Sequence, residues 1–251
     1  MAIKLFNNFK LDFAIVGAQK AGTTALYSFI KKHPKVLFGN TKELHYFDDD
    51  NLFTHNNQEV NKSNLKKLFP TGAKNMLKGD ATPIYMYWDN AIERLRKHNS
   101  KLKIIVILRD PVERAFSHWK MEYYKGNDKE NFYYAIKNEE ERLKESQHRI
   151  FSYKSRGLYT RQLDRIYSNF PKKNILVIKH CDLKNNHEQT VQTVFNFLDI
   201  YYVQTKKEEV QPSSMVNFKS DLTMNNNEKE YLENFFKHEK NKLRSKYLIN
   251  L

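Results

Sequence analysis

The sequence is poor in cysteine, proline and glycine. Its 251 residues include 1 cysteine, 6 prolines and 7 glycines. The lone cysteine, Cys181, cannot form an intrachain disulfide, and a zinc site built from several cysteines is excluded. The few prolines and glycines do not gather into a linker. We therefore expect one domain that spans residues 1–251.

Long hydrophobic segments are also missing. The longest apolar run, residues 104–108, is far shorter than the roughly 20 residues that a membrane-spanning helix needs. Residues 1–13 have neither that length nor the apolar core of a signal peptide. These absences predict a protein with no membrane span that works in the cytoplasm.

Acidic residues are in deficit, with 29 Asp and Glu against 43 Lys and Arg, for a net charge of +14. Such an excess predicts an anionic partner, which could be nucleic acid, an acidic membrane, a nucleotide cofactor or an acidic polymer. Compositional bias alone gives the same excess, so charge does not choose among these. Hydrophobic residues make up 40% of the chain, which is enough for a core and excludes disorder of the whole chain.

Short apolar runs alternate with amphipathic stretches along the chain. The runs at 13–16, 36–38, 103–108 and 173–178 predict buried strands. Helical spacing predicts helices at 22–33, 89–98, 112–124, 131–145, 158–170, 190–198 and 228–246, and polar composition predicts loops at 49–64 and 204–227. This alternation predicts an α/β fold, a single domain with a parallel β-sheet flanked by helices.

The segment Gly17–Thr24 lies where the first predicted strand meets the first predicted helix. Backbone N–H groups at a helix start, two threonine hydroxyls and the charge of Lys20 suit a bound phosphate. The pattern nearly matches the nucleotide-binding loop G-x-x-x-x-G-K-[ST], but Thr23 stands at the lysine position. A P-loop kinase or nucleotide hydrolase is therefore one alternative, and an ordinary strand-to-helix turn is another.

A second basic segment follows the strongest predicted strand. Arg109 comes directly after that strand, and Ser117 lies about two helical turns later. The carboxyl ends of parallel strands share one edge of the sheet, so we expect Arg109 and Ser117 to reach the same ligand as the first loop. Alternatively, Arg109 pairs with Asp110 or Glu113 at the surface, and Ser117 is a neutral helix residue.

Together these segments resemble the sulfotransferase family. VGAQKAGTT (16–24) resembles its 5′-phosphosulfate loop, and ILRDPVERAFS (107–117) resembles its 3′-phosphate segment. KELHYFD (42–48) is similar to the segment that carries the catalytic base in the heparan-sulfate type, and SRGLY (155–159) matches a stretch common in bacterial members. The resemblance covers residues 12–198 and implies the P-loop-like sulfotransferase fold.

The resemblance also implies an activity, the transfer of a sulfuryl group from 3′-phosphoadenosine 5′-phosphosulfate (PAPS) to an acceptor hydroxyl or amine, without a metal. It implies Glu43 as the general base, His45 as its orienting partner or the alternative base, and Lys20 as the group that stabilises the leaving phosphate. Asp48 would support this pair. The implied cofactor-binding residues are Lys20, Ala21, Gly22, Thr23, Thr24, Arg109 and Ser117.

Two departures from the family pattern concern the acceptor and the adenine. The heparan-sulfate enzymes carry a lysine just before the next Thr/Ser-Pro, whereas this chain has Asp80-Ala81-Thr82-Pro83. The role of that lysine is vacant or filled by Lys78, which disfavours a glycosaminoglycan acceptor. The basic loop that covers adenine is not recognisable, and residues 217–219 are a weak candidate for it. The expected partner is a small-molecule or carbohydrate acceptor, with an anionic one among the options.

A nucleic-acid-binding protein is the second alternative function. It would need a basic stripe with interleaved aromatic residues. The lysine pairs at 66–67, 172–173 and 206–207 are short and scattered, so we expect no nucleic-acid partner. The aromatic segments 85–88 and 119–124 line either an acceptor cleft or the core.

Overall fold

A computed structural model describes residues 9–53, 61–71, 75–144, 148–204 and 222–251. Its strands form one 5-stranded sheet in the order β2-β3-β1-β4-β5. Every neighbouring pair is parallel, which confirms the predicted α/β class with a parallel sheet. The strands are β1 (Phe13–Gly17), β2 (Val36–Phe38), β3 (Leu77–Asp80), β4 (Lys103–Leu108) and β5 (Ile175–Lys179).

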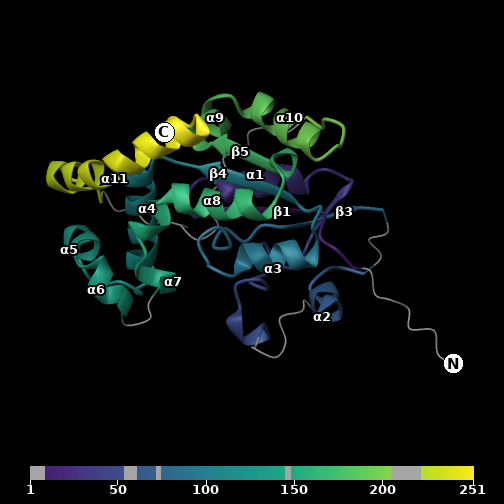
Figure 1. The fold of residues 1–251 in the computed structure, drawn as a ribbon, viewed down its shortest axis with the longest axis horizontal. Coiled ribbons are helices and arrows are strands. Elements are labelled where there is room, and N and C mark those ends of the chain that lie inside the picture. The colour runs from purple at the N-terminus through teal and green to yellow at the C-terminus, as the bar shows by residue number, and fades with distance from the viewer. Residues whose placement is uncertain (1–8, 54–60, 72–74, 145–147, 205–221) are drawn as a thin grey trace.

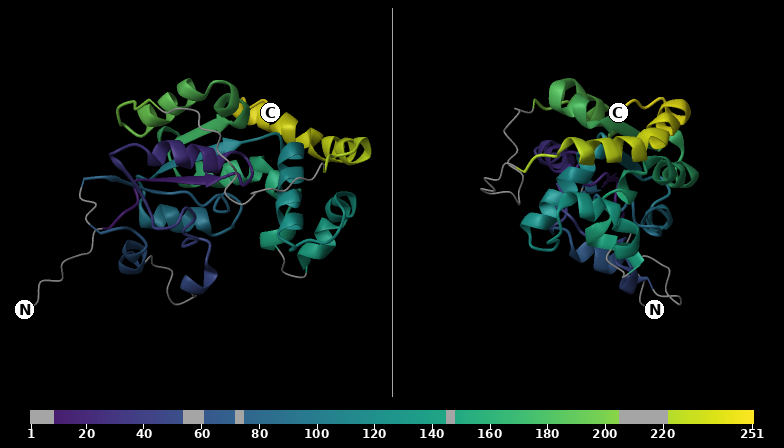
Figure 2. Two further views of the ribbon diagram at one scale, coloured as in Figure 1. Left: turned by 180° about the vertical axis from the view of Figure 1, so that it is seen from behind. Right: turned by 90° about the vertical axis from the view of Figure 1, so that its left-hand side faces the viewer.

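Helices cover both faces of this sheet (Figures 1 and 2). In Figure 1, α3 and α8 lie in front of the strands, whereas the view from behind in Figure 2 has α1 and α10 in front. The helices are α1 (Thr23–Lys31), α2 (Lys62–Lys67), α3 (Ala91–His98), α4 (Pro111–Tyr124), α5 (Phe132–Lys137), α6 (Glu139–Lys144), α7 (His148–Phe151), α8 (Tyr159–Asn169), α9 (His180–Asn185), α10 (His187–Phe197) and α11 (Asn226–Tyr247), with 3-10 turns at Asp50–Leu52, Ser155–Gly157 and Lys172–Asn174. Among the described residues, no helix is both long and apolar enough to cross a bilayer.

The main core lies against the sheet. All five residues of β1 are buried, and so are all residues of β4 except Lys103, because helices cover both faces of these central strands. A second apolar cluster lies under α4, α5 and α11 and contains Trp119, Phe132 and Phe236. This cluster packs α4, α5 and α11 against one another.

The order of the strands fixes where a ligand can bind. From β1 the chain first builds β2 and β3 on one side of β1, and then builds β4 and β5 on the other side. Ligands of open parallel sheets bind at the carboxyl ends of the strands where the direction of winding reverses. Here that place is the rim beyond β1 and β4, where the loop after Gly17 and the residue Arg109 are found.

Several elements differ from the sequence expectations. Strand β3 was not predicted, because its sequence, Leu-Lys-Gly-Asp, is short and largely polar. The helix expected at 131–145 is two helices, since α5 ends at Lys137 and α6 begins at Glu139. The expected loop at 49–64 contains a 3-10 turn and the start of α2, and α9 follows β5 without a predicted signal.

Candidate active site

The turn between β1 and α1 leaves a helix N-terminus open. Gly22 caps α1 with φ 99°, a left-handed conformation that glycine adopts without strain, and no side chain caps the helix. The first backbone N–H groups of α1 therefore point out of the helix without intrahelical partners. The backbone of Lys20 is also in the left-handed region, with φ 68°. Residues other than glycine rarely adopt this conformation, so the turn is constrained by its surroundings.

A cavity of about 660 Å³ lies at this turn and brings most of the predicted site residues together. Lys20, Gly22, Thr23, Thr24, Glu43, Arg109 and Ser117 all line it. Ala21 does not: its side chain is fully buried, and its N–H donates to the carbonyl of Ala18 at 3.1 Å. His45 does not line it either: it lies beside Glu43, and its side chain is 49% exposed.

Lys20 is the central cation of the cavity. Burial, followed by the positive charges of Lys125 and Arg109, lowers its pKa to about 8. Cations brought together in a concave site destabilise one another until an anion is bound. This arrangement suits a ligand with more than one negative group.

Arg109 reaches across to the first loop. Its guanidinium lies 3.0 Å from the Glu113 carboxylate and 3.4 Å from the carbonyl oxygen of Lys20. The surface pair with Glu113 that the sequence left open is therefore present, yet both residues line the cavity. Ser117 lies on α4, the same helix as Glu113, and lines the same cavity.

The segment Ser155–Tyr159 supports both loops from behind. Arg156 is buried and donates hydrogen bonds to the side chain of Gln19 and to Ser152 Oγ. Tyr159 donates its hydroxyl to the carbonyl of Arg109 at 3.0 Å. The SRGLY motif thus connects the loop after β1, through Gln19, with the segment after β4, through Arg109.

The segment that follows β2 carries an array of charged groups around Glu43. Lys42 Nζ lies 2.6 Å from Glu43 Oε1, and His45 Nε2 lies 3.5 Å from Glu43 Oε2. On its other side, His45 Nδ1 lies 3.0 Å from Asp48 Oδ2, and Arg149 donates to the same oxygen at 2.5 Å. The array runs from the cavity, through His45, to the buried carboxylate of Asp48.

These contacts set the protonation states of His45 and Glu43. Hydrogen bonds to Asp48 and then to Glu43 raise the pKa of His45 to about 9. Burial alone would raise the pKa of Glu43, but hydrogen bonds from His45 and Lys42 lower it. At neutral pH His45 is an imidazolium with no free lone pair, whereas Glu43 is a carboxylate that can accept a proton.

The end of β3 anchors the backbone that carries Glu43. Thr82 Oγ1 donates to Asp80 Oδ1 at 2.7 Å and accepts the N–H of Leu44 at 3.0 Å. Tyr85 donates its hydroxyl to Asp80 Oδ2 at 2.6 Å and accepts the N–H of Tyr46 at 3.2 Å. The sequence Asp-Ala-Thr-Pro-Ile-Tyr is therefore a clamp that fixes the position of the Glu43 segment.

Lys78 does not fill the vacant lysine position. Its Nζ donates to the carbonyl of Met76 at 3.2 Å and lies 3.9 Å from Asp12, and it does not line the cavity. The suggestion that Lys78 serves the acceptor is therefore wrong, because its side chain turns to Asp12 before β1. Lys42 is the lysine that lies beside Glu43.

Sequence reasoning missed several residues of the cavity. Lys120 and Met121 lie inside the segment 119–124 but were not singled out in it, and Lys125 lies just beyond that segment, eight residues after Ser117, so helical spacing could have found all three. His180 begins α9 directly after β5, at the same rim as Arg109. Residues 217–219, named for adenine, lie outside the described residues. The described part of the chain has no group of three or more His, Cys, Asp or Glu that could hold a metal.

Of the aromatic segments, 85–88 is divided between core and cavity. Tyr85 is fully buried in the clamp, whereas Tyr87 and Trp88 line a second pocket. In 119–124, Trp119 belongs to the core and Met121 to the cavity wall.

Comparisons with known proteins agree with this geometry. The chain is 25% identical to the membrane-associated sulfotransferase kil1 of Dictyostelium discoideum, over 92% of this chain and 64% of that protein. It is 26% identical to the heparan sulfate glucosamine 3-O-sulfotransferase 5 of Mus musculus, over 74% of this chain and 52% of that protein. The chain therefore spans about half to two thirds of these relatives.

Among solved structures, the fold matches a sulfotransferase from Alicyclobacillus acidocaldarius with a TM-score of 0.79 at 23% identity, over 97% of this chain and 98% of that one. The family model described as "Sulfotransferase domain" matches residues 10–250. With nearly the whole described chain inside that match, the protein belongs to the sulfotransferase domain family.

Proposed function

We propose that the protein transfers a sulfuryl group from PAPS to a hydroxyl or amine of a small-molecule or carbohydrate acceptor. The observation that carries the proposal is a single cavity that joins an open helix N-terminus and Lys20 to Arg109, Ser117 and Glu43. The first four features are donors and cations that suit a ligand with two separate phosphate groups. Glu43 is a base that suits an acceptor that must lose a proton.

The residues present fit the cofactor. The N–H groups at the start of α1 and the ammonium of Lys20 would hold the 5′-phosphosulfate, since both are donors that face the cavity. The guanidinium of Arg109 and the hydroxyl of Ser117 would hold the 3′-phosphate. When bound, PAPS supplies an activated sulfuryl group attached to a phosphate leaving group.

Three side chains carry the remaining chemistry. Glu43, deprotonated at neutral pH, would accept the proton of the attacking hydroxyl, and His45 would keep its carboxylate oriented. Lys20 would stabilise the negative charge that the leaving phosphate gains. With that charge met by Lys20 and backbone N–H groups, the proposed reaction needs no metal.

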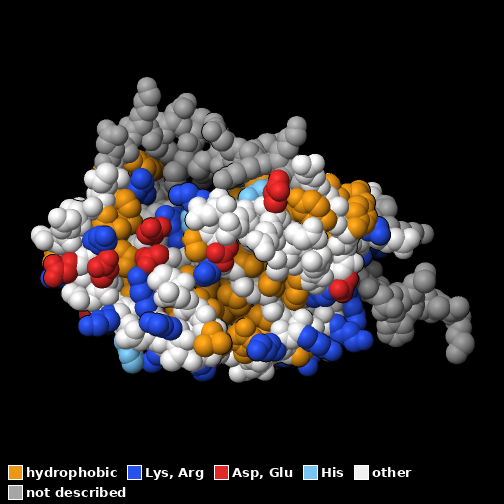
Figure 3. All heavy atoms as spheres, turned by 90° about the horizontal axis from the view of Figure 1, so that it is seen from above, with side chains coloured by type: hydrophobic (Ala, Val, Ile, Leu, Met, Phe, Trp, Pro, Cys, Tyr) orange, Lys and Arg blue, Asp and Glu red, His pale blue; other side chains and the backbone are white. Residues whose placement is uncertain are grey.

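The alternatives are less well supported. A P-loop kinase requires a lysine at the position that Thr23 occupies. A nucleic-acid-binding protein requires a continuous basic stripe, whereas on the face in Figure 3 the Lys and Arg side chains are interrupted by acidic, apolar and neutral ones. A cytoplasmic location stays a prediction, and the relative from Dictyostelium is described as membrane-associated.

Binding of 3′-phosphoadenosine 5′-phosphate (PAP), the product nucleotide, tests the proposal before any acceptor is known. Isothermal titration calorimetry in EDTA should give saturable PAP binding that is lost in Lys20→Ala and in Arg109→Ala. Exposed Arg96 on α3 gives the matched control Arg96→Ala, which should bind PAP normally. Tighter binding of ATP with Mg²⁺ than of PAP would favour the kinase instead.

A further inference from the structure

Helix α4 lines the first cavity along much of its length. Its cavity-lining residues recur every three or four positions, which places them on one side of the helix: Glu113, Phe116, Ser117, Lys120 and Met121. Lys125, which caps the C-terminus of the helix, continues this stripe and lines the cavity as well. The proposed function gives Lys125 no role.

The turn that ends α4 fixes the position of Lys125. Gly126 has φ 75°, and its N–H donates to the carbonyl of Tyr123 at 3.0 Å. The N–H of Asn127 donates to the carbonyl of Glu122 at 2.9 Å. A left-handed glycine with these two bonds is a Schellman motif, which ends a helix at a defined residue. The backbone of Lys125 is therefore held in place by local hydrogen bonds.

Glu122 anchors the side chain of Lys125. The Glu122 side chain is only 5% exposed; its Oε1 lies 3.7 Å from Lys125 Nζ, and its Oε2 accepts from the Asn127 side chain at 2.7 Å. His118 lies 3.9 Å from the same carboxylate, but burial and then nearby cations lower its pKa well below the usual value, so it is neutral. Lys125 is therefore the charged group that pairs with this carboxylate.

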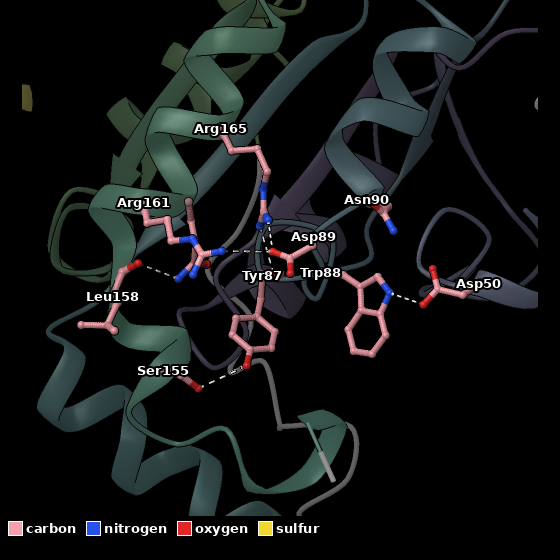
Figure 4. Close-up of a pocket in the computed structure, with 10 residues that line it drawn as sticks. Asp50, Tyr87, Trp88, Asp89, Asn90, Ser155, Leu158, Arg161 and Arg165 are labelled. Carbon is pink, nitrogen blue, oxygen red and sulfur yellow. Dashed lines mark hydrogen bonds and ion pairs between the residues drawn. The ribbon is translucent and has the colours of Figure 1, made fainter. Parts of the chain in front are cut away.

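The ammonium of Lys125 keeps N–H donors for a ligand. A separation of 3.7 Å from Glu122 is an ion pair but is longer than a hydrogen bond. The second pocket shows the opposite case (Figure 4): there Arg165 binds Asp89 at 2.5 Å and donates to two backbone carbonyls. Lys125 thus combines a fixed place in the cavity wall with donors that a bound anion can use.

Lys125 lies on the Lys20 side of the cavity. Among the charged groups, Lys125 lowers the pKa of Lys20 most, ahead of Arg109. Along α4, Lys125 is eight residues beyond Ser117, about 12 Å along the helix axis and on the side away from Arg109. With the 3′-phosphate at Arg109 and Ser117 and the 5′-phosphate at Lys20, the next group along the ligand is the sulfuryl group of PAPS.

We propose that Lys125 binds the sulfuryl group of PAPS and holds it in line for transfer, and that Glu122 positions Lys125. This inference rests on the proposed function. In the transfer, a bond forms from the acceptor oxygen to sulfur while the bond from sulfur to the 5′-phosphate breaks. Glu43 takes the proton of the acceptor, and Lys20 faces the phosphate that keeps the electron pair. A cation on the sulfuryl oxygens keeps sulfur between these two groups, as an in-line displacement requires.

PAPS and PAP differ only in the sulfuryl group, so two calorimetric titrations test the contact without an acceptor. Lys125→Gln should weaken PAPS binding about tenfold, the effect of one hydrogen bond from a charged donor, and should change the Kd of PAP by less than about threefold. Lys125→Arg keeps the cation and should keep most of the PAPS affinity. Exposed Lys129, outside the cavity, gives the matched control Lys129→Gln, which should bind both ligands normally.

Glu122→Gln provides the second arm of the test. Without the anchoring charge, Lys125 should hold the sulfuryl group less well, and the ratio of the PAPS and PAP dissociation constants should shift about threefold. Added to Lys125→Gln, the same change should leave that ratio as it is, because Glu122 acts through Lys125. A further shift in the double variant would overturn the positioning role of Glu122.

The two ligands also separate this inference from the proposed function. Equal weakening of PAPS and PAP in Lys125→Gln would assign Lys125 to a phosphate of the nucleotide and overturn the proposal, and so would unchanged binding of both. In either case PAP binding by the wild type would leave the proposed function standing. A wild-type protein that binds neither PAPS nor PAP would contradict the proposed function itself.

Discussion

The imidazole of His45 stands between two carboxylates, with Nε2 3.5 Å from Glu43 and Nδ1 3.0 Å from Asp48. This position raises the pKa of His45 to about 9, so the ring is charged and donates from both nitrogens at neutral pH. Its φ of 51° is left-handed, which for a histidine is a conformation that the surroundings must impose. Glu43 is therefore held by its neighbours on both sides, Lys42 and His45.

The pH dependence of sulfuryl transfer should follow His45. At saturating PAPS, where the bound phosphate keeps Lys20 charged, we expect kcat to be level near neutral pH and to fall above about pH 9, where the imidazolium loses the proton that it donates to Glu43. His45→Gln keeps an N–H donor that does not titrate. It should react about 100-fold more slowly, because the base is less well placed, and should lack the alkaline fall. A fall above pH 9 that persists in His45→Gln would contradict this assignment.

His45 should also make the stability of the folded protein depend on pH. The pKa of His45 is raised in the folded state from 6.5 to about 9. Its stabilising contribution is therefore full below about pH 6.5 and is lost as the pH rises through 9. Thermal melts of wild type and His45→Gln should diverge most near pH 6 and converge above pH 9.

PAP binding should take up protons through Lys20. The pKa of Lys20 is about 8 in the empty cavity, so at pH 8 about half of the molecules carry Lys20 as a neutral amine. A bound phosphate favours the charged ammonium form. Calorimetry in buffers of different ionisation enthalpy should show uptake of about half a proton at pH 8. Lys20→Arg, which stays charged, should show none. Equal uptake in the two proteins would assign the proton to another group.

Arg149 should act as a positioning residue. It binds Asp48, which in turn binds His45, and its own side chain does not line the cavity. Arg149→Gln should leave the Kd for PAP unchanged and lower kcat by about tenfold. With one cation removed from Asp48, the alkaline fall in rate should move to higher pH. A weaker Kd for PAP with an unshifted pH profile would indicate a merely structural role.

Gly157 should tolerate no side chain. A Cβ at this position would lie 2.7 Å from Cζ of the Phe236 ring and 3.1 Å from Cβ of Pro111. Gly157→Ala should lower the free energy of unfolding by about 1–3 kcal/mol, as overpacking in cores does. Adding Phe236→Leu should recover part of the loss, which denaturant unfolding would measure. A wild-type midpoint in Gly157→Ala would refute the close contact.

The central strands and the positions of the two loops at the rim could be predicted because their signals are local. A continuous apolar run predicts β4, and a glycine with two threonines after β1 predicts the open start of α1. Arg109 and Ser117 followed from the rule that parallel strands end at one rim. Each of these inferences needs only a few neighbouring residues.

The features that escaped prediction depend on contacts between distant segments. Strand β3 is polar, and what fixes it in the sheet is its pairing with β1 and β2 rather than its own pattern. The clamp of Asp80 on the Glu43 segment joins residues more than 30 positions apart. The second pocket, lined by Tyr87, Trp88 and residues of α8, likewise forms only when α8 packs beside the segment after β3.

The central claim is that one cavity binds PAPS through Lys20 and activates the acceptor through Glu43. The most direct measurement is transfer of radiolabelled sulfate from PAPS to a panel of phenols and oligosaccharides, made beside PAP titrations of the same proteins. We predict transfer by wild type, and loss of transfer with an unchanged Kd for PAP in Glu43→Gln. In Lys20→Ala, both transfer and PAP binding should be lost. Full transfer by Glu43→Gln, or undiminished PAP binding by Lys20→Ala, would contradict the account.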